Sequence, residues 1–194
     1  MDAIETLMTE HRLIERAIDA LVVFAGETGL EATDERAELG RFVTFIREFA
    51  DGCHHGKEED ILFQAMIEAG FPRAGGPIAV MLMEHDQGRQ QVAALKALAE
   101  QAVPWTAEDR RRLTEAAHGY ANLLRQHIHK EDAILYPMAA QRLPPELMER
   151  VSRDCERYEA GKTGSGERER LHRLAEELVA RHAGALPRGG HGRT

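Results

Sequence analysis

The chain has 194 residues, of which 43% are hydrophobic and 30% are charged, and its formal net charge at pH 7 is −8. This length suffices for one domain with a buried core and a C-terminal appendage. The negative charge argues against binding to nucleic acid or to an anionic membrane, because both require a basic face that replaces counterions.

Other features of the sequence favour a cytoplasmic protein. No apolar stretch approaches the length of a membrane span. The N-terminal residues Met1–Glu5 lack the basic start and the apolar run of a signal peptide. Cys53 and Cys155 lie far apart and provide no disulfide framework, which favours a reducing compartment. We expect a monomer or a homodimer.

Helix-forming residues dominate, prolines cluster at breaks, and no alternating β-branched run appears, so the sequence predicts an all-α fold. The first helix is expected from about residue 2 to residue 25. Its apolar seam repeats every three or four residues, and His11 occupies one of the seam positions. A polar ring in an aliphatic row costs stability unless it is ligated or hydrogen-bonded.

The second helix is expected from an N-cap at Thr33 to about residue 69. Its early apolar row ends at Cys53 and its later row begins at His54, so the two rows differ in phase by one residue. Ordinary helical drift does not explain this difference over so short a distance. Either Gly52 or a local bulge absorbs it. The Gly- and Pro-rich segment 70–77 then ends the helix.

Two further long helices complete the predicted bundle. The third, at about 78–101, repeats the anomaly of the first, since His85 lies in its apolar seam. The fourth begins after a capping arrangement at Thr106 and runs to about residue 141. Both His127 and Glu131 lie in its seam, and a buried carboxylate without a cation is costly.

The sequence divides into two predicted parts. Residues 1–142 are expected to form an antiparallel up-down-up-down four-helix bundle, because the connections between the long helices are short. Residues 143–194 are expected to form a C-terminal helical extension, with two charged helices at about 146–160 and 166–183 and a disordered tail from residue 184.

A repeated pattern marks the candidate site. His54 and Glu58 lie four residues apart, and His127 and Glu131 repeat this spacing 73 residues later. On a helix, residues four apart lie on one face, so each copy presents an imidazole and a carboxylate side by side. The pairs Glu10-His11 and Glu84-His85 form a second repeat. The predicted metal ligands are His11, His54, Glu58, His85, His127 and Glu131.

The donor set suggests which metal would bind. Imidazole and carboxylate donors without a thiolate suit iron or manganese better than a structural zinc ion. Glu58 and Glu131 would each bridge two metal ions about 3.5–4 Å apart. Six protein donors leave open positions on two six-coordinate ions, where water, dioxygen, peroxide or nitric oxide would bind.

Several neighbouring residues are alternatives. His55 and Glu59 have the same spacing one residue on, but Ile128 and Asp132 stand at the equivalent positions, so we expect outer or surface roles for this pair. Whether either joins the site stays open.

Glu15 lies four residues after His11, whereas the equivalent position is Arg89. An ion pair with an arginine is the favoured role for Glu15, with ligation left open. Lys57 and Lys130 are expected to extend outward into solvent.

With these motifs the chain resembles the hemerythrin-like, or HHE cation-binding, family over residues 1–142. The resemblance rests on segments 10–16, 54–63, 83–85 and 127–132. It implies a left-handed four-helix bundle around two non-haem iron ions, bridged by carboxylates and by an oxo or hydroxo group. It also implies terminal imidazole ligands from the four seam histidines and bridging carboxylates from Glu58 and Glu131.

One departure from the family pattern bears on function. Oxygen-carrying members have a further histidine four residues after the third-helix histidine, and here that residue is Arg89. This argues against a pure oxygen carrier. Iron–sulfur repair relatives carry a Cys-bearing N-terminal extension that this sequence lacks, and no output domain follows residue 142, so repair and signal-transduction roles rank lower.

The leading hypothesis is a di-iron protein that binds dioxygen, nitric oxide or peroxide for sensing, binding or detoxification. Whether the protein is an enzyme that consumes peroxide or nitric oxide stays open. The alternative is an iron-responsive or iron-storage interaction module without turnover, in which residues 143–194 form the partner surface.

Overall fold

The computed structural model describes residues 2–27, 35–102, 104–162 and 166–182. Within these ranges all regular structure is helical and no strand occurs, which confirms the predicted all-α class. The predicted N-cap Thr33 and the predicted tail from residue 184 lie outside the described residues. None of the described helices has the length and apolar character that a membrane span requires.

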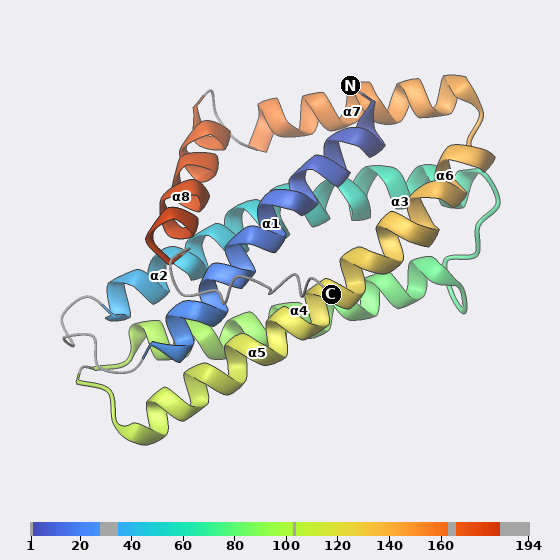
Figure 1. Ribbon diagram of the computed structural model, residues 1–194. Helices are drawn as coiled ribbons and strands as arrows, with labels where there is room; N and C mark the ends of the chain where they lie inside the picture. The colour runs from blue at the N-terminus through green and yellow to red at the C-terminus, as the bar shows by residue number, and fades with distance from the viewer. Residues whose placement is uncertain (1, 28–34, 103, 163–165, 183–194) are drawn as a thin grey trace, which may run out of the picture.

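The long helices of the first part begin and end close to the predicted positions (Figure 1). α1 spans Ala3–Gly26 and begins at a capping box, in which the Asp2 side chain accepts from the backbone N–H of Glu5. α4 spans Pro77–Glu100. α5 spans Ala107–Lys130 and begins at the predicted capping arrangement at Thr106.

The helix that contains His54 is a composite. It runs through α2 (Glu35–Phe45), a π-helical segment (Ile46–His55), a second π-helical segment (Glu58–Leu62) and α3 (Phe63–Glu68). α5 likewise continues through a π-helical segment (Glu131–Leu135) into α6 (Tyr136–Arg142).

The first π-helical segment accounts for the phase difference in the sequence. A π-helix bonds each N–H to the carbonyl five residues earlier, so a π turn accommodates one extra residue. The segment Ile46–His55 contains the junction of the two apolar rows, and Gly52 lies inside it. A Cβ atom at Gly52 would lie 3.1 Å from the carbonyl oxygen of Arg47. The local bulge is therefore what the structure shows, and the small residue lies in a tight part of it.

The other two π-helical segments begin at equivalent positions of the repeat, Glu58 and Glu131. Both follow the histidine of their copy by four residues. The duplicated sequence thus produces the same helical distortion twice, once at each candidate bridging carboxylate. π turns of this kind occur frequently at functional sites.

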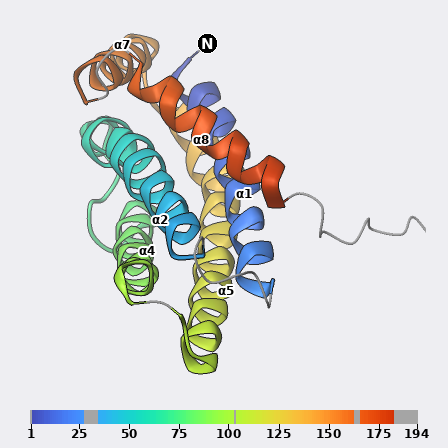
Figure 2. The same cartoon turned by 90° about the vertical axis from the view of Figure 1, so that its left-hand side faces the viewer.

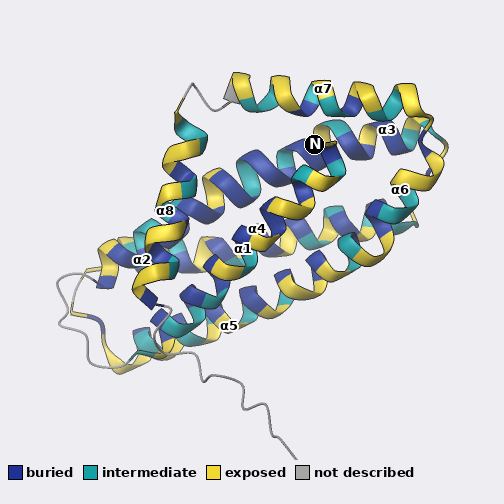
Figure 3. Ribbon diagram, turned by 45° about the horizontal axis from the view of Figure 1, so that its top comes forward, coloured by how far each residue is buried: buried dark blue, intermediate teal, exposed yellow. Residues whose placement is uncertain are grey.

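Two apolar clusters fill the interior, one on each side of the candidate site. The first contains Leu13, Phe49 and Leu124, and the second contains Leu7, Leu62 and Leu135. Each long helix contributes to both clusters and has its polar seam residues between them. Figure 3 shows the buried residues along the faces by which the long helices meet. Apolar side chains therefore enclose the candidate site on both sides along the length of the helices.

The C-terminal extension packs across the other helices instead of projecting from them. α7 spans Pro145–Lys162 and α8 spans Glu167–His182. α8 lies across α1 and α2 (Figure 2). Its buried Leu171 and Leu178 belong to the first cluster, and Val151 of α7 belongs to the second. The extension therefore contributes to the core, and the division of the chain at residue 142 stays a prediction.

Candidate metal centre

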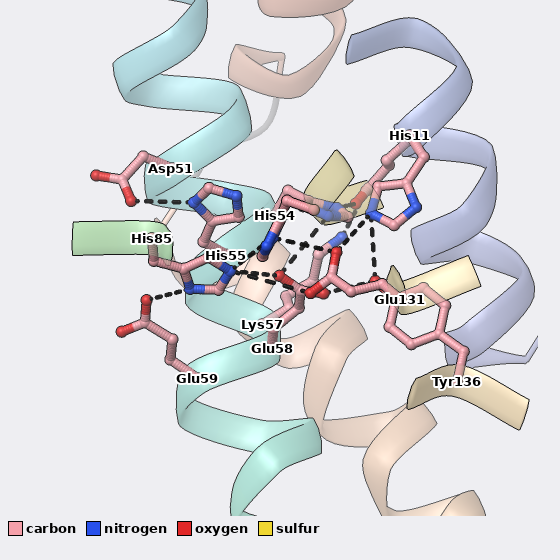
Figure 4. A network of polar contacts seen from close by, with 12 residues as sticks. His11, Asp51, His54, His55, Lys57, Glu58, Glu59, His85, Glu131 and Tyr136 are labelled. Carbon is pink, nitrogen blue, oxygen red and sulfur yellow. Dashed lines mark hydrogen bonds and ion pairs between the residues drawn. The ribbon is translucent and has the colours of Figure 1, made fainter. Parts of the chain in front are cut away.

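The structure brings the six predicted side chains to one place. Figure 4 shows how His11, His54, Glu58, His85 and Glu131 lie there. The six side chains come from α1, the composite second helix, α4, and α5 with its π-helical continuation. None is more than 2% exposed. Two overlapping groups of potential ligands arise, in each of which one donor atom per residue lies within 4.8 Å of the others. The first group is His11, His54, Glu58 and Glu131, and the second is His55, Glu58, His85 and His127.

The two carboxylates lie between imidazoles of different helices. Oε2 of Glu131 lies 3.3 Å from Nε2 of His11 and 3.2 Å from Nε2 of His127. Oε2 of Glu58 lies 3.8 Å from Nε2 of His54 and 3.5 Å from Nε2 of His85. Each carboxylate therefore contacts one imidazole of each group, as a residue that bridges two ions would.

Several buried polar atoms at the centre lack hydrogen-bond partners. Among the described residues, these atoms include Nε2 of His54, Oε2 of Glu58 and both carboxylate oxygens of Glu131. Leaving such atoms unsatisfied in the interior is costly, and native proteins rarely do so without a reason. Burial and the nearby Glu58 carboxylate raise the pKa of Glu131 well above its ordinary value. Cations bound here would provide partners for these polar atoms and would reduce the repulsion between the Glu58 and Glu131 carboxylates. The residues therefore fit a metal centre.

Every one of the four seam imidazoles is held by a carboxylate at Nδ1. The pairs are His54 with Glu10 at 2.9 Å, His127 with Glu84 at 3.0 Å, His11 with Asp132 at 2.7 Å, and His85 with Glu59 at 2.7 Å. This arrangement places a proton on Nδ1, where the carboxylate accepts it. Nε2 then has no proton and directs its lone pair toward the centre. It is the arrangement that usually surrounds metal-binding histidines.

These supporting carboxylates obey the same repeat as the inner residues. Glu10 and Glu84 precede the lone histidines, and Glu59 and Asp132 follow the candidate bridging glutamates. The sequence pattern predicted an outer or surface role for Glu59, and its contact with His85 agrees with an outer role. Glu10, Glu84 and Asp132 stood in the same patterns without a predicted role. The repetition of an acidic residue beside each candidate ligand was the signal that would have identified them.

Burial also keeps three of the four seam imidazoles, those of His54, His85 and His127, neutral. It lowers the pKa of His127 to about 3 and lowers the pKa of His54 and His85 well below the ordinary value. Metal ions bind the neutral ring, so no proton competes with the metal at these nitrogens near neutral pH.

The prediction that Lys57 extends into solvent is wrong. Its side chain is fully buried, its Nζ donates to Oε1 of Glu10 at 2.5 Å, and it also contacts Glu159 of α7. The buried Glu10 carboxylate needs a cation, and the ammonium group supplies one. The equivalent Lys130 donates to Glu84, but its side chain is 33% exposed.

Glu15 forms an ion pair with Arg12 at 2.8 Å, the role that the sequence favoured. Tyr136, to which the sequence analysis gave no role, donates its hydroxyl to Oε1 of Glu58 at 2.5 Å and lies 3.4 Å from Nε2 of His11. The equivalent residue in the first copy is Phe63. The sequence did contain a signal for Tyr136, because the two copies of the repeat differ at this apolar position by a single hydroxyl group.

A cavity of about 240 Å³ adjoins one side of the centre. His55, His85 and His127 line the cavity at the centre, while Arg47, Arg89 and Lys96 also line it. The remaining lining is mainly apolar and includes Val92, Tyr120 and Leu124. Gly88 lies opposite Tyr120, and a Cβ atom there would lie 3.7 Å from the ring.

Comparisons with known proteins agree with this geometry. The model of the hemerythrin HHE cation binding domain matches residues 2–139. An iron-sulfur cluster repair protein, YtfE, from Musicola paradisiaca is 40% identical over 94 residues, which cover 44% of this chain and 40% of the relative. A probable iron-sulfur cluster repair protein from Haemophilus influenzae is 35% identical over 91 residues, which cover 43% of this chain and 39% of the relative. The chain thus matches well under half the length of these relatives, and the comparison with solved structures gave no significant match. The family match spans most of the chain and includes all six predicted ligands, so the protein belongs to the hemerythrin HHE cation-binding family.

Proposed function

We propose that the protein holds two non-haem iron ions and binds dioxygen, nitric oxide or peroxide at them. One observation carries this proposal: buried, unpartnered oxygens of two carboxylates lie among imidazoles that are each held at Nδ1 by a carboxylate. When bound, the iron pair supplies electrons and open coordination positions for a small ligand.

The proposed ligand assignment follows the contacts. His11 and His54 would hold the first ion, His85 and His127 would hold the second, and Glu58 and Glu131 would be shared by both. Apolar clusters on both sides exclude water, which strengthens the electrostatic interactions within the site. The cavity beside His85 and His127 is the proposed approach for the exogenous ligand.

We also propose the up-down-up-down bundle for the four long helices. Its support is the packing of α4 against α2 and α5, and of α1 against α5. Neighbouring antiparallel helices joined by short connections make such contacts. In this arrangement each long helix passes the centre once, so each contributes at its polar seam.

Metal analysis and optical spectra test the proposal. We expect about two irons per chain after anaerobic reconstitution, by analogy with carboxylate-bridged two-metal sites. Exposure of the reduced protein to air or nitric oxide should produce new charge-transfer bands, and Glu131→Ala should abolish them together with most of the bound iron. Wild-type protein that binds no iron pair, or a reduced iron pair whose spectrum neither gas changes, would contradict the proposal.

Turnover is a separate question with its own measurement. Steady-state decay of peroxide or nitric oxide by the iron-loaded protein would make it an enzyme, whereas ligand binding without decay would make it a carrier or a sensor. The names of the matched relatives favour one further candidate, a role in iron–sulfur cluster repair. Restoration of a damaged cluster protein by the iron-loaded chain, and not by free iron at the same concentration, tests that candidate.

A further inference from the structure

We propose that His55 is a third imidazole donor to the second metal ion, beside His85 and His127. This inference rests on the proposed di-iron function and adds a donor that the sequence repeat does not predict. It makes the two metal positions chemically unlike, with three imidazoles at the second and two at the first.

The position of the His55 ring carries the proposal. His55 is 6% exposed, and it has a donor atom within 4.8 Å of donor atoms of Glu58, His85 and His127. Its ring stacks on that of His85, with centroids 3.9 Å apart and an interplanar angle of 13°. Figure 4 shows the two rings side by side at the edge of the centre. His55 therefore lies beside the two histidines proposed for the second ion and lines the same cavity.

The orientation of His55 matches that of the other imidazoles. Its Nδ1 lies 3.3 Å from Oδ1 of Asp51, so a carboxylate holds this ring on the same nitrogen as the four seam histidines. A proton on Nδ1 would satisfy this contact and leave the lone pair of Nε2 available to a metal ion.

Arg89 donates hydrogen bonds to both of the carboxylates that hold His55 and His85. Its Nε donates to Asp51 at 2.9 Å, and one of its terminal nitrogens donates to Glu59 at 2.7 Å. Asp51 holds His55 and Glu59 holds His85. The guanidinium is not a metal ligand, but it fixes both carboxylates and, through them, the two stacked rings.

The backbone conformation explains why the sequence repeat does not predict His55 as a metal ligand. In a regular α-helix, the side chains of adjacent residues point about 100° apart, so His54 and His55 would not both face the centre. The π-helical segment Ile46–His55 ends at this pair, and its wider turn reduces that angle. In the second copy the equivalent residue is Ile128, which lies in the regular helix α5 and packs in an apolar cluster.

Mössbauer and X-ray absorption spectroscopy of the iron-loaded protein test the inference. The wild type should show two distinct iron environments. His55→Gln should lose one imidazole per iron pair and change the signal of one iron only. His118→Gln removes an exposed imidazole from α5 and serves as the control. Its spectra should equal those of the wild type.

A second measurement uses azide as a probe of open positions. His55→Gln frees a further position beside the cavity, so azide should produce a charge-transfer band in addition to those that the wild type and His118→Gln show. A His55→Gln protein with two irons, unchanged spectra and no new azide band would overturn the inference while leaving the proposed function intact. If His55→Gln does not fold, two identical iron environments in the wild type would overturn it. Failure of the wild type to bind iron would instead refute the proposed function.

Discussion

Replacement of Lys57 by methionine tests whether the two copies of the repeat have different surroundings. Lys57 and its partner Glu10 are both at most 1% exposed, so Lys57→Met would leave a buried carboxylate without its main cation. Breaking a buried pair in this way costs about 3–5 kcal/mol. Arg168 of α8 lies 3.5 Å from the same Glu10 oxygen and compensates in part, so we expect a loss near the lower end of that range. Lys130→Met is the matched control, because that side chain is 33% exposed and such ion pairs contribute about 0–1 kcal/mol.

Urea denaturation of both variants measures this difference. Chelator-treated protein is the appropriate sample, because a bound metal would add its own contribution through the contact of Glu10 with His54. The slope of the unfolding free energy against urea should stay constant, since neither change alters the surface exposed on unfolding. Equal losses for the two variants, or a loss below about 1 kcal/mol for Lys57→Met, would refute the reasoning.

Three further predictions follow from the same structure. Glu10→Gln and Glu84→Gln should each weaken iron binding by about 10- to 100-fold, because each carboxylate orients a proposed ligand, and competition with a chelator measures the loss. Cys53 and Cys155 should resist alkylation at pH 8 in the folded protein, because burial raises their pKa to about 11 and about 12 and leaves little thiolate, and the rate should increase as the pH approaches those values. Leu178→Ala should lower the free energy of unfolding by about 2–5 kcal/mol, because this fully buried side chain joins α8 to the core, whereas a thermal unfolding profile equal to that of the wild type would show that α8 is dispensable.

The sequence predicted the convergence of six side chains because that information is local and duplicated. His54 and Glu58 share a face in any helix, and the second copy repeats them in another. The lone His11 and His85 were conspicuous because they interrupt apolar seams. The start of α5 after the capping box at Thr106 followed from a short-range hydrogen-bonding rule of the same kind.

The unpredicted features all depend on contacts between segments far apart in the chain. Lys57 is buried because Glu159 of α7 covers it, and no pattern around residue 57 contains that information. The charged sequence of α8 is only weakly amphipathic and did not predict where this helix would pack. In the structure its few apolar residues are buried in the first cluster. The phase change before His54 indicated a local irregularity, but its consequence for the direction of His55 required the actual backbone.

The repeat and the extension together produce a centre whose two halves differ. The duplicated pairs supply nearly equivalent candidate ligands and supporting carboxylates. Outside them, α7 and α8 cover the half that contains His54, since Glu159 and Arg168 contact the Lys57–Glu10 pair and Tyr158 donates to the carbonyl oxygen of Gly52. The half that contains His127 borders the cavity instead. Under the proposed function, a small ligand that enters through this cavity would meet the proposed second metal position first, where His55 and Arg89 line the entrance.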